Sequence, residues 1–335
     1  MIITKTPYRV SLFGGGSDHP QWFATHGGQV ISFTIDKYCY LTTRILPPFF
    51  SHNFRIAYSI IEMVKHYNEI DHPVIRECIR RHAPHLMLEI NHHGDLPARS
   101  GVGSSSAFTV GVIHALLALQ GKPTVSTELA NLAIEMEQKI LKENVGWQDQ
   151  IACAIGGLNR IDFASDLSWK ITEIKLPLER IRNFESRLAV VYTGVSRNSS
   201  DVSLGLIENL QSKVSEMKNL MEMVEVCQKI FVGSSDLDVI GEMLDESWRL
   251  KRSINNQSSS SSLDSFYSSA KKAGALGGKI LGAGGGGFFL FWLREGQLED
   301  FKSRFMQGTF VPIKVSYGGS EVIHDSQSLE KLGSL

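Results

Sequence analysis

The sequence has 335 residues, of which 42% are hydrophobic and 21% charged, and its formal net charge is −1. A chain of this length can bury a large core, and the composition is that of an ordinary globular protein. Because a nearly neutral chain has no electrostatic attraction for nucleic acid or an anionic membrane, we expect small-molecule partners. With no signal-peptide pattern, no apolar run long enough to cross a bilayer and four cysteines without paired spacing, we expect a cytoplasmic protein.

Strand-like and helical patterns follow one another irregularly in the first half of the chain. Apolar and β-branched runs predict strands at 9–13, 29–35, 40–46 and 86–90, whereas helical periodicity predicts helices at 104–120 and 127–143. The strand-like runs "GGLNRIDF" and "SWKITEIKL" follow. We place a domain boundary between residues 175 and 186.

The second half begins with the strand-like "RLAVVYTGV" and continues with a long helical region from about residue 200 to residue 253. The low-complexity "NQSSSSSLDS" is predicted to be a solvated, mobile loop before the helical "SLDSFYSSAKKAG", and the strand-like "FFLFWL" and "IKVSYG" follow. Since helices and strands do not alternate regularly, we predict an α+β fold with two domains, residues 1–180 and 181–335.

The segment "LPARSGVGSSSAFTVGVIHALLALQG" runs from a Gly/Ser cluster into a helix that is apolar on all sides. Such a helix is enclosed by other elements, so its unpaired N–H groups and its positive dipole end lie inside the protein, where an anion is their natural partner. Glycines allow close approach of the backbone, and serine hydroxyls can bind phosphate oxygens or Mg²⁺. We interpret the segment as a phosphate-binding loop; a capped helix after a Gly-rich turn is the alternative.

Dense glycine clusters occur at three places, 12–18, 99–107 and 278–289. Glycine weakens helices and strands, so three clusters beside apolar strands indicate backbone that lies against ligands.

Two acids stand out near the end of the first half. Glu137 lies within the apolar face of its predicted helix, where a carboxylate needs a cation, a hydrogen-bond network or a raised pKa. It can be a metal ligand or the partner of a buried arginine. Asp149, in "GWQDQIACAIGG", precedes a small apolar helical segment, so it can face a cleft or simply cap that helix.

In their order and spacing these motifs resemble the GHMP kinase superfamily, over nearly the whole chain. The motifs that match are "TPYRVSLFGGGSD", "PARSGVGSSSA", "GGKILGAGGGGFF" and "GWQDQ", together with the acid Glu137. The resemblance implies a ribosomal S5-like N-terminal half, which binds ATP, and a ferredoxin-like C-terminal half. Val102 stands where the family usually has leucine.

The resemblance also implies roles for individual residues. Ser105 and Glu137 would hold Mg²⁺, and Asp149 would face the substrate hydroxyl beside Arg9, which would stabilise its negative charge. The residues expected at the ATP phosphates are Pro97, Arg99, Ser100, Gly101, Val102, Gly103, Ser104, Ser105, Ser106, Gly282, Ala283 and Gly284.

The form "FGGGSD", with "YTGVSRNS" and "SWRLKRS", looks like the D-glycero-D-manno-heptose 7-phosphate kinases and related fucokinase-type domains. The residues expected at the sugar are Gly15, Gly16, Ser17, Asp18, Gly194, Arg197 and Lys251, with Arg197 and Lys251 as cations for a substrate phosphate.

Three other functions are considered. A fucokinase- or galactokinase-like kinase of an unphosphorylated sugar fits the same motifs, and an inactive sensor on this fold would have lost Asp149, Glu137 and Ser105, which are present. An NAD-binding site at "GAGGGG" is not supported, because a strand-like run and not a helix follows the glycines. The oligomeric state is left open.

Overall fold

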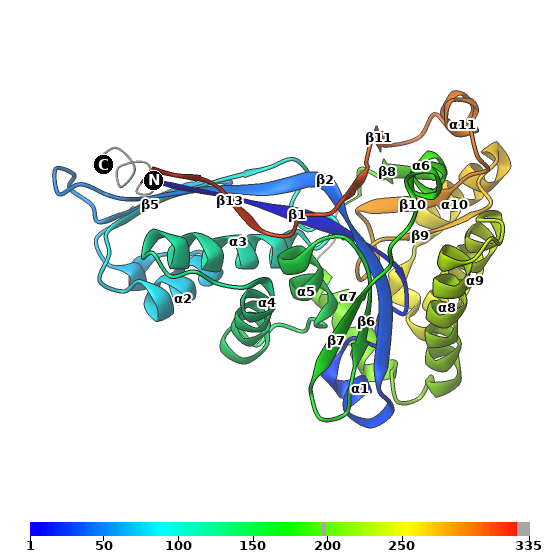
Figure 1. Ribbon diagram of the computed structural model, residues 1–335, viewed down its shortest axis with the longest axis horizontal. Coiled ribbons are helices and arrows are strands. Elements are labelled where there is room, and N and C mark those ends of the chain that lie inside the picture. Colours follow the sequence, from blue (N-terminus) through cyan, green and yellow to red (C-terminus); the bar gives the residue numbers. More distant parts are fainter. Residues whose placement is uncertain (196–198, 327–335) are drawn as a thin grey trace.

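The computed structural model describes residues 1–195 and 199–326 (Figure 1). Its elements, in chain order, are β1 (Ile2–Phe13), α1 (Pro20–His26), β2 (Gly28–Ile45), β3 (Phe54–Ala57), β4 (Ile61–Val64), η1 (Tyr67–Glu69), α2 (Pro73–His82), β5 (Leu88–Gly94), α3 (Ser104–Leu119), α4 (Ser126–Ile134), η2 (Glu135–Ile140), α5 (Gln148–Ile155), β6 (Leu158–Phe163), β7 (Trp169–Glu173), α6 (Leu178–Ser186), β8 (Leu188–Tyr192), α7 (Ser199–Asn209), α8 (Val214–Val232), α9 (Asp238–Ile254), η3 (Asn256–Ser258), α10 (Ser261–Ala273), β9 (Gly277–Ile280), β10 (Phe288–Trp292), α11 (Leu298–Arg304), β11 (Thr309–Val311), β12 (Val315–Ser316) and β13 (Glu321–Asp325).

A nine-stranded sheet is built around the long strand β2. Its main order is β13-β1-β2-β5-β3-β4, and β6, β7 and β12 extend it beside β2. The start of β2 pairs with β6 and its end pairs with β5, so the two predicted strands at 29–35 and 40–46 are one continuous strand. Helices α2, α3, α4 and α5 lie together on one side of this sheet (Figure 1).

Helix α3 is the centre of the first half, as its all-round apolar sequence predicts. Of its 16 residues, 12 are buried, and it packs against both β1 and β2. The helix predicted at 127–143 is α4 continued by the π-helical turn η2, and it ends at Ile140 because Lys142 adopts a positive φ of 55°.

The second half has a four-stranded antiparallel sheet of order β11-β8-β10-β9. In chain order its strands and helices form a β-α-β-β-α-β unit, so the expected ferredoxin-like arrangement and the α+β class are confirmed. Helices α8, α9 and α10 lie together at this end of the molecule (Figure 1).

The chain returns to the first sheet at its end. Strand β12 pairs with β2, and β13 pairs with β1, so residues 315–325 lie with the sheet of the first half. The domain division at residue 180 stays a prediction, but the strand pairing shows that the polypeptide crosses between the two sheets more than once.

One loop differs from its prediction. The serine-rich segment was expected to be solvated, but Ser258 is buried and its carbonyl accepts a hydrogen bond of 2.9 Å from the backbone N–H of Gly285. A low-complexity composition predicts a solvated loop only when nothing packs on it, and here the third glycine cluster does.

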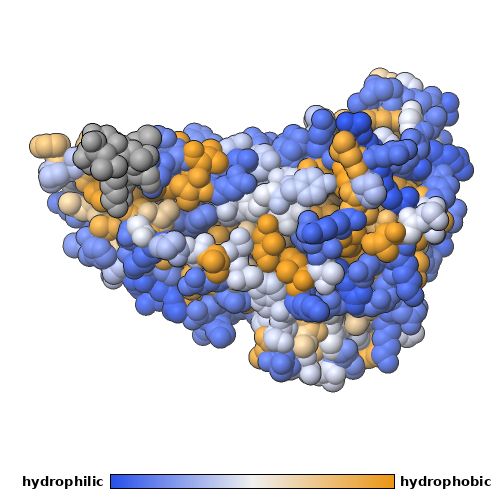
Figure 2. All heavy atoms as spheres, viewed as in Figure 1, coloured by the Kyte–Doolittle hydropathy of each residue, from blue (hydrophilic) through white to orange (hydrophobic). Residues whose placement is uncertain are grey.

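No helix of the described residues is long and apolar enough to cross a bilayer. On the face drawn in Figure 2, hydrophobic residues form small groups among hydrophilic ones. The charged residues that stand out are buried ones, among them Arg9, Glu137 and Lys279, and buried charges are rare unless they have partners.

We expect Gly156→Ala to destabilise the protein more than Gly121→Ala. Both glycines have positive φ, which costs about 1 kcal/mol for alanine. A Cβ on Gly156 would in addition lie 2.3 Å from the Gly318 carbonyl carbon in the segment that returns to the first sheet, whereas a Cβ on Gly121 meets nothing within 4 Å. Urea unfolding of both variants measures the difference; equal losses would contradict the tight packing of the returning segment.

Candidate functional site

A cavity of about 130 Å³ is lined by residues from both halves of the molecule. Strand β1, the first glycine turn and the start of α5 contribute from the first half, and α7, α8, α9 and the third glycine cluster from the second. Its polar and glycine lining residues are Arg9, Ser11, Gly15, Gly16, Asp18, His19, Gly146, Gln148, Asp149, Ser203, Ser247, Lys251, Lys279 and Gly282.

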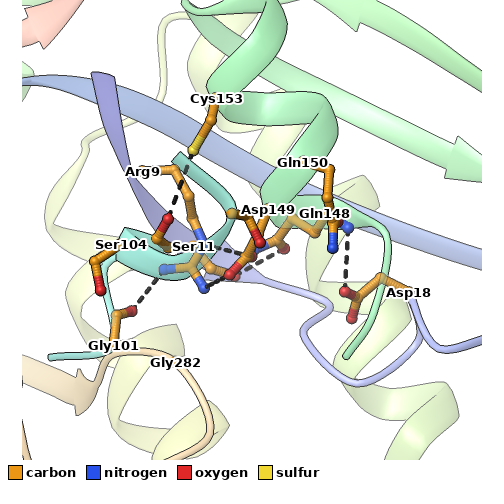
Figure 3. Close-up of polar contacts among 12 residues, drawn as sticks. Arg9, Ser11, Asp18, Gly101, Ser104, Gln148, Asp149, Gln150, Cys153 and Gly282 are labelled. Carbon is orange, nitrogen blue, oxygen red and sulfur yellow. Dashed lines mark hydrogen bonds and ion pairs between the residues drawn. The ribbon is translucent and has the colours of Figure 1, made fainter. Parts of the chain in front are cut away.

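Arg9 and Asp149 form a two-point ion pair at this cavity (Figure 3). The Nε of Arg9 donates to Asp149 Oδ1 over 2.7 Å, and its Nη2 donates to Asp149 Oδ2 over 2.6 Å. The third donor, Nη1, reaches the Gly101 carbonyl over 2.6 Å. A single buried guanidinium therefore joins β1, the phosphate-binding loop and α5.

Asp149 is the second residue of α5, and its carboxylate points to Arg9 and not to the helix N-terminus. The interpretation of Asp149 as a simple helix cap is therefore wrong. Its side chain is 26% exposed, so the carboxylate oxygens keep lone pairs that a bound hydroxyl can reach.

The second and third glycine clusters lie in direct contact. Gly101 has φ 86°, and a Cβ there would lie 2.3 Å from the Leu281 carbonyl oxygen; a Cβ on Gly282 would lie 2.6 Å from the Gly101 Cα. Only glycine at both positions lets these two backbones meet. The loop before α3 is thus closed from the other side by the loop after β9.

The serines at the start of α3 face different surroundings. Ser105 is exposed, Ser104 is partly buried and accepts a hydrogen bond from the Arg99 N–H, and Ser106 is buried. Ser106 Oγ donates to Glu137 Oε2 over 2.9 Å, so in this structure Ser106, and not Ser105, is the serine in contact with Glu137. Pro97 and Arg99 are exposed at the entrance to the loop.

Glu137 is fully buried in the π-helical turn η2, a local geometry that is frequent at functional sites. Besides Ser106, Gln150 Nε2 donates to its Oε2, while Oε1 has no hydrogen-bond partner among the described residues. No arginine of the described residues pairs with it, so the alternative of a buried arginine partner has no support in this part of the chain. Burial raises the pKa of Glu137 to about 7. An unpartnered carboxylate oxygen at the start of α3 fits a hard cation.

Among the residues predicted at the sugar, the structure brings Gly15, Gly16, Asp18 and Lys251 to the cavity. Asp18 is held by two backbone donors, the N–H of Gly16 over 3.0 Å and the N–H of Gln148 over 3.3 Å. Its carboxylate is therefore oriented before any ligand arrives.

Two other residues predicted at the sugar, Ser17 and Gly194, do not line the cavity. Ser17 is fully buried and exchanges hydrogen bonds with the backbone of Gln29, and Gly194 is exposed. Arg197 lies outside the described residues.

Lys279 lines the cavity and was missed by sequence reasoning. It is 5% exposed, and its Nζ donates to the Leu12 carbonyl over 3.0 Å. Burial, together with the nearby Arg9 guanidinium, lowers the pKa of Lys279 to about 7, and the Asp18 carboxylate opposes this change. The signal was present in "GGKILGAGGGG", where one lysine stands in a strand of glycine and apolar residues, as Glu137 does in its helix.

Lys251, on α9, is partly buried beside it. Its Nζ donates to the carbonyl of Gly282, and burial, with Lys279 nearby, lowers the pKa of Lys251 well below its usual value. Neither lysine forms an ion pair with any described residue. The cavity thus holds two ammonium groups without a carboxylate in contact.

Two family models match the chain. One described as GHMP kinases N terminal domain matches residues 65–157, and one described as GHMP kinases C terminal matches residues 223–310. The D-glycero-alpha-D-manno-heptose 7-phosphate kinase of Campylobacter jejuni is 28% identical over 309 residues, 87% of this chain and 89% of that protein. The galactokinase of Pyrococcus furiosus is 25% identical over 315 residues, 84% of this chain and 86% of that protein.

A solved structure shares the whole fold. The D-glycero-D-manno-heptose 1-phosphate kinase from Bacteriodes thetaiotaomicron superposes with a TM-score of 0.80 and 24% identity, and the match covers 97% of this chain and 100% of that one. At this identity the likeness shows the fold alone. The fold class expected from the motifs is confirmed.

We expect Glu137→Gln to stabilise the metal-free protein at alkaline pH. The folded carboxyl has a pKa of about 7 against its usual value of 4.5, so the folded state holds a proton that the unfolded state has lost, and stability falls as pH rises between these values. Glutamine carries no such penalty. The variant should exceed the wild type by up to about 3 kcal/mol above neutral pH, and the two should converge in mild acid. Urea unfolding across this pH range measures it; a difference that does not vary with pH would contradict the buried neutral acid.

Proposed function

Because the chain belongs to the GHMP kinases, phosphotransferases that use ATP and an alcohol acceptor, we propose that it phosphorylates the anomeric hydroxyl of D-glycero-D-manno-heptose 7-phosphate. The observation that carries the proposal is the Arg9–Asp149 pair, which faces the cavity while the same arginine holds the phosphate-binding loop. A proton acceptor and an anion-binding loop are thereby joined by one side chain.

The chain's own residues act mainly by position and charge. The acceptor hydroxyl donates a hydrogen bond to Asp149, which takes its proton as the oxygen bonds to the terminal phosphorus of ATP and ADP leaves. Arg9 keeps the carboxylate in place through two hydrogen bonds and stabilises its negative charge. Asp18, oriented by two backbone donors, accepts hydrogen bonds from other hydroxyls of the sugar.

The phosphates of ATP fit the start of α3. Residues 101–106 present backbone N–H groups and hydroxyls at the positive end of this helix, and residues 282–284 close over them. Mg²⁺ would be held by Glu137 and a serine of the loop, Ser105 as the family pattern implies or Ser106 as its contact with Glu137 suggests. A bound Mg²⁺ would neutralise part of the negative charge of the ATP phosphates.

Two features support a phosphorylated sugar as the acceptor. The Campylobacter jejuni relative, a heptose 7-phosphate kinase, matches 87% of this chain. The ammonium groups of Lys251 and Lys279 line the cavity without ion pairs, and an anionic group on the sugar would complement them. An unphosphorylated sugar, the acceptor of a galactokinase-like enzyme, would leave the positive charge of these two lysines without a partner, although part of this charge can interact with the phosphates of ATP.

We expect Asp149→Asn to fold and bind ATP but to lose turnover. An amide cannot take the hydroxyl proton, and such assistance is worth about 10²–10⁴-fold in rate. The measurement is kcat in a coupled ADP-release assay. Asp162→Asn is the matched control, because Asp162 also pairs with an arginine, Arg160, but does not line the cavity. A near-normal kcat in Asp149→Asn would rule out the proposed proton acceptor.

The acceptor is tested with four sugars. We expect kcat/KM for D-glycero-D-manno-heptose 7-phosphate to exceed by about 10-fold or more the values for unphosphorylated heptose, fucose and galactose, since a hydrogen bond to a charged group contributes about 1.5–3 kcal/mol. The product of the preferred reaction is checked by NMR for a phosphate on the anomeric carbon. Equal efficiency with a neutral sugar would favour the fucokinase- or galactokinase-like alternative.

A further inference from the structure

Four residues that line the cavity carry hydrogen-bond donors with spare capacity. Lys279 and Lys251 contribute ammonium groups, and Ser247 and Ser203 contribute hydroxyls. Ser247 and Lys251 are four residues apart on α9, so they lie on the same face of that helix. Within the described residues neither serine hydroxyl has a hydrogen-bond partner, although Ser247 is only 3% exposed.

Lys279 is the more buried of the two lysines. An ammonium group has three donors, and only one, toward the Leu12 carbonyl, is used within the described residues. The charged groups that face it are Arg9, Lys251 and Asp18. Arg9 is already paired with Asp149, so Asp18 alone opposes the two lysines. A buried cation with two free donors is costly unless a ligand supplies the anion.

The contacts of the two lysines differ in direction. Lys251 donates to the Gly282 carbonyl and, over 3.5 Å, to the Ile280 carbonyl. Because the backbone of Gly282 lies against Gly101 of the phosphate-binding loop, Lys251 borders the nucleotide side. Lys279 donates instead to β1 at Leu12 and interacts electrostatically with Asp18, the residue placed at the sugar. Lys279 therefore faces the acceptor side of the cavity.

We propose that Lys279 and Ser247 form the subsite for the phosphate group that the sugar already carries, with Lys251 between this subsite and the phosphate-binding loop. The ammonium donates charge-assisted hydrogen bonds to two phosphate oxygens, and the serine hydroxyl donates to a third. The inference rests on the proposed function, since it requires a phosphorylated acceptor. On this proposal, Lys279 of the third glycine cluster and Ser247 of α9 select a phosphorylated sugar over an unphosphorylated one.

The test uses Lys279→Met, Lys279→Arg and Ser247→Ala in the full chain. Lys271→Met is the matched control, because Lys271 is also bonded to a backbone carbonyl but lies on α10 away from the cavity. For Lys279→Met we expect kcat/KM for heptose 7-phosphate to fall about 10- to 150-fold, with little change for unphosphorylated heptose and in the KM for ATP. In Ser247→Ala this kcat/KM should fall less, and Lys279→Arg should retain much of the preference for the phosphorylated sugar. Calorimetric titration with heptose 7-phosphate should show the same order of affinities without turnover.

The pH dependence adds an independent readout. The ammonium of Lys279 is lost as pH rises through about 7, so the KM for heptose 7-phosphate should rise over that range in the wild type. In Lys279→Arg the guanidinium stays charged, so the rise should disappear.

The outcomes separate the two proposals. If the wild type shows no preference for the phosphorylated sugar, the proposed acceptor fails and this subsite with it. If the preference is present but Lys279→Met and Ser247→Ala retain it, the subsite alone is overturned. If Lys279→Met raises the KM for ATP as much as it raises the KM for heptose 7-phosphate, Lys279 binds the nucleotide, and the proposed subsite is overturned. Should Lys279→Met fail to fold, Lys279→Arg and Ser247→Ala still decide.

Discussion

The arrangement of the site depends on one buried side chain, Arg9. A guanidinium that is almost fully enclosed must have its donors satisfied, and two segments distant from β1 in the sequence supply the acceptors: the Asp149 carboxylate at the start of α5 and the Gly101 carbonyl before α3. These segments can lie together only in the folded chain. The same requirement that stabilises the buried cation therefore places a proton acceptor beside an anion-binding loop.

The protein buries two groups whose charges are unfavourable in the absence of a ligand. Burial raises the pKa of Glu137 and lowers that of Lys279, and both approach the neutral range from opposite sides. A fold selected for stability alone would replace such groups with apolar ones of similar volume. The presence of both groups is explained if a cation binds Glu137 and an anion binds Lys279.

The two halves of the molecule share the chemistry. The first sheet and its helices supply Arg9, Asp149 and the phosphate-binding loop, and the second half supplies α9 and the loop that begins at Gly282. The loops meet where Gly101 and Gly282 let their backbones touch, and the return of β12 and β13 to the first sheet ties the halves together. Small changes at this junction would alter both substrate sites at once.

The sequence by itself determined the features that depend on local spacing. The all-round apolar pattern of α3, the burial of Glu137 and the glycine turns follow from periodicity and residue type, and the motif order indicated the family. Only the tertiary structure decided which serine meets Glu137, that Ser258 is buried, and that Lys279 reaches the cavity. The reason is physical, because these contacts join segments that lie apart in the sequence, in one case by more than two hundred residues. A shift of one residue in the phase of a helix or the register of a strand does not show in the local sequence pattern, yet it would point each side chain in another direction.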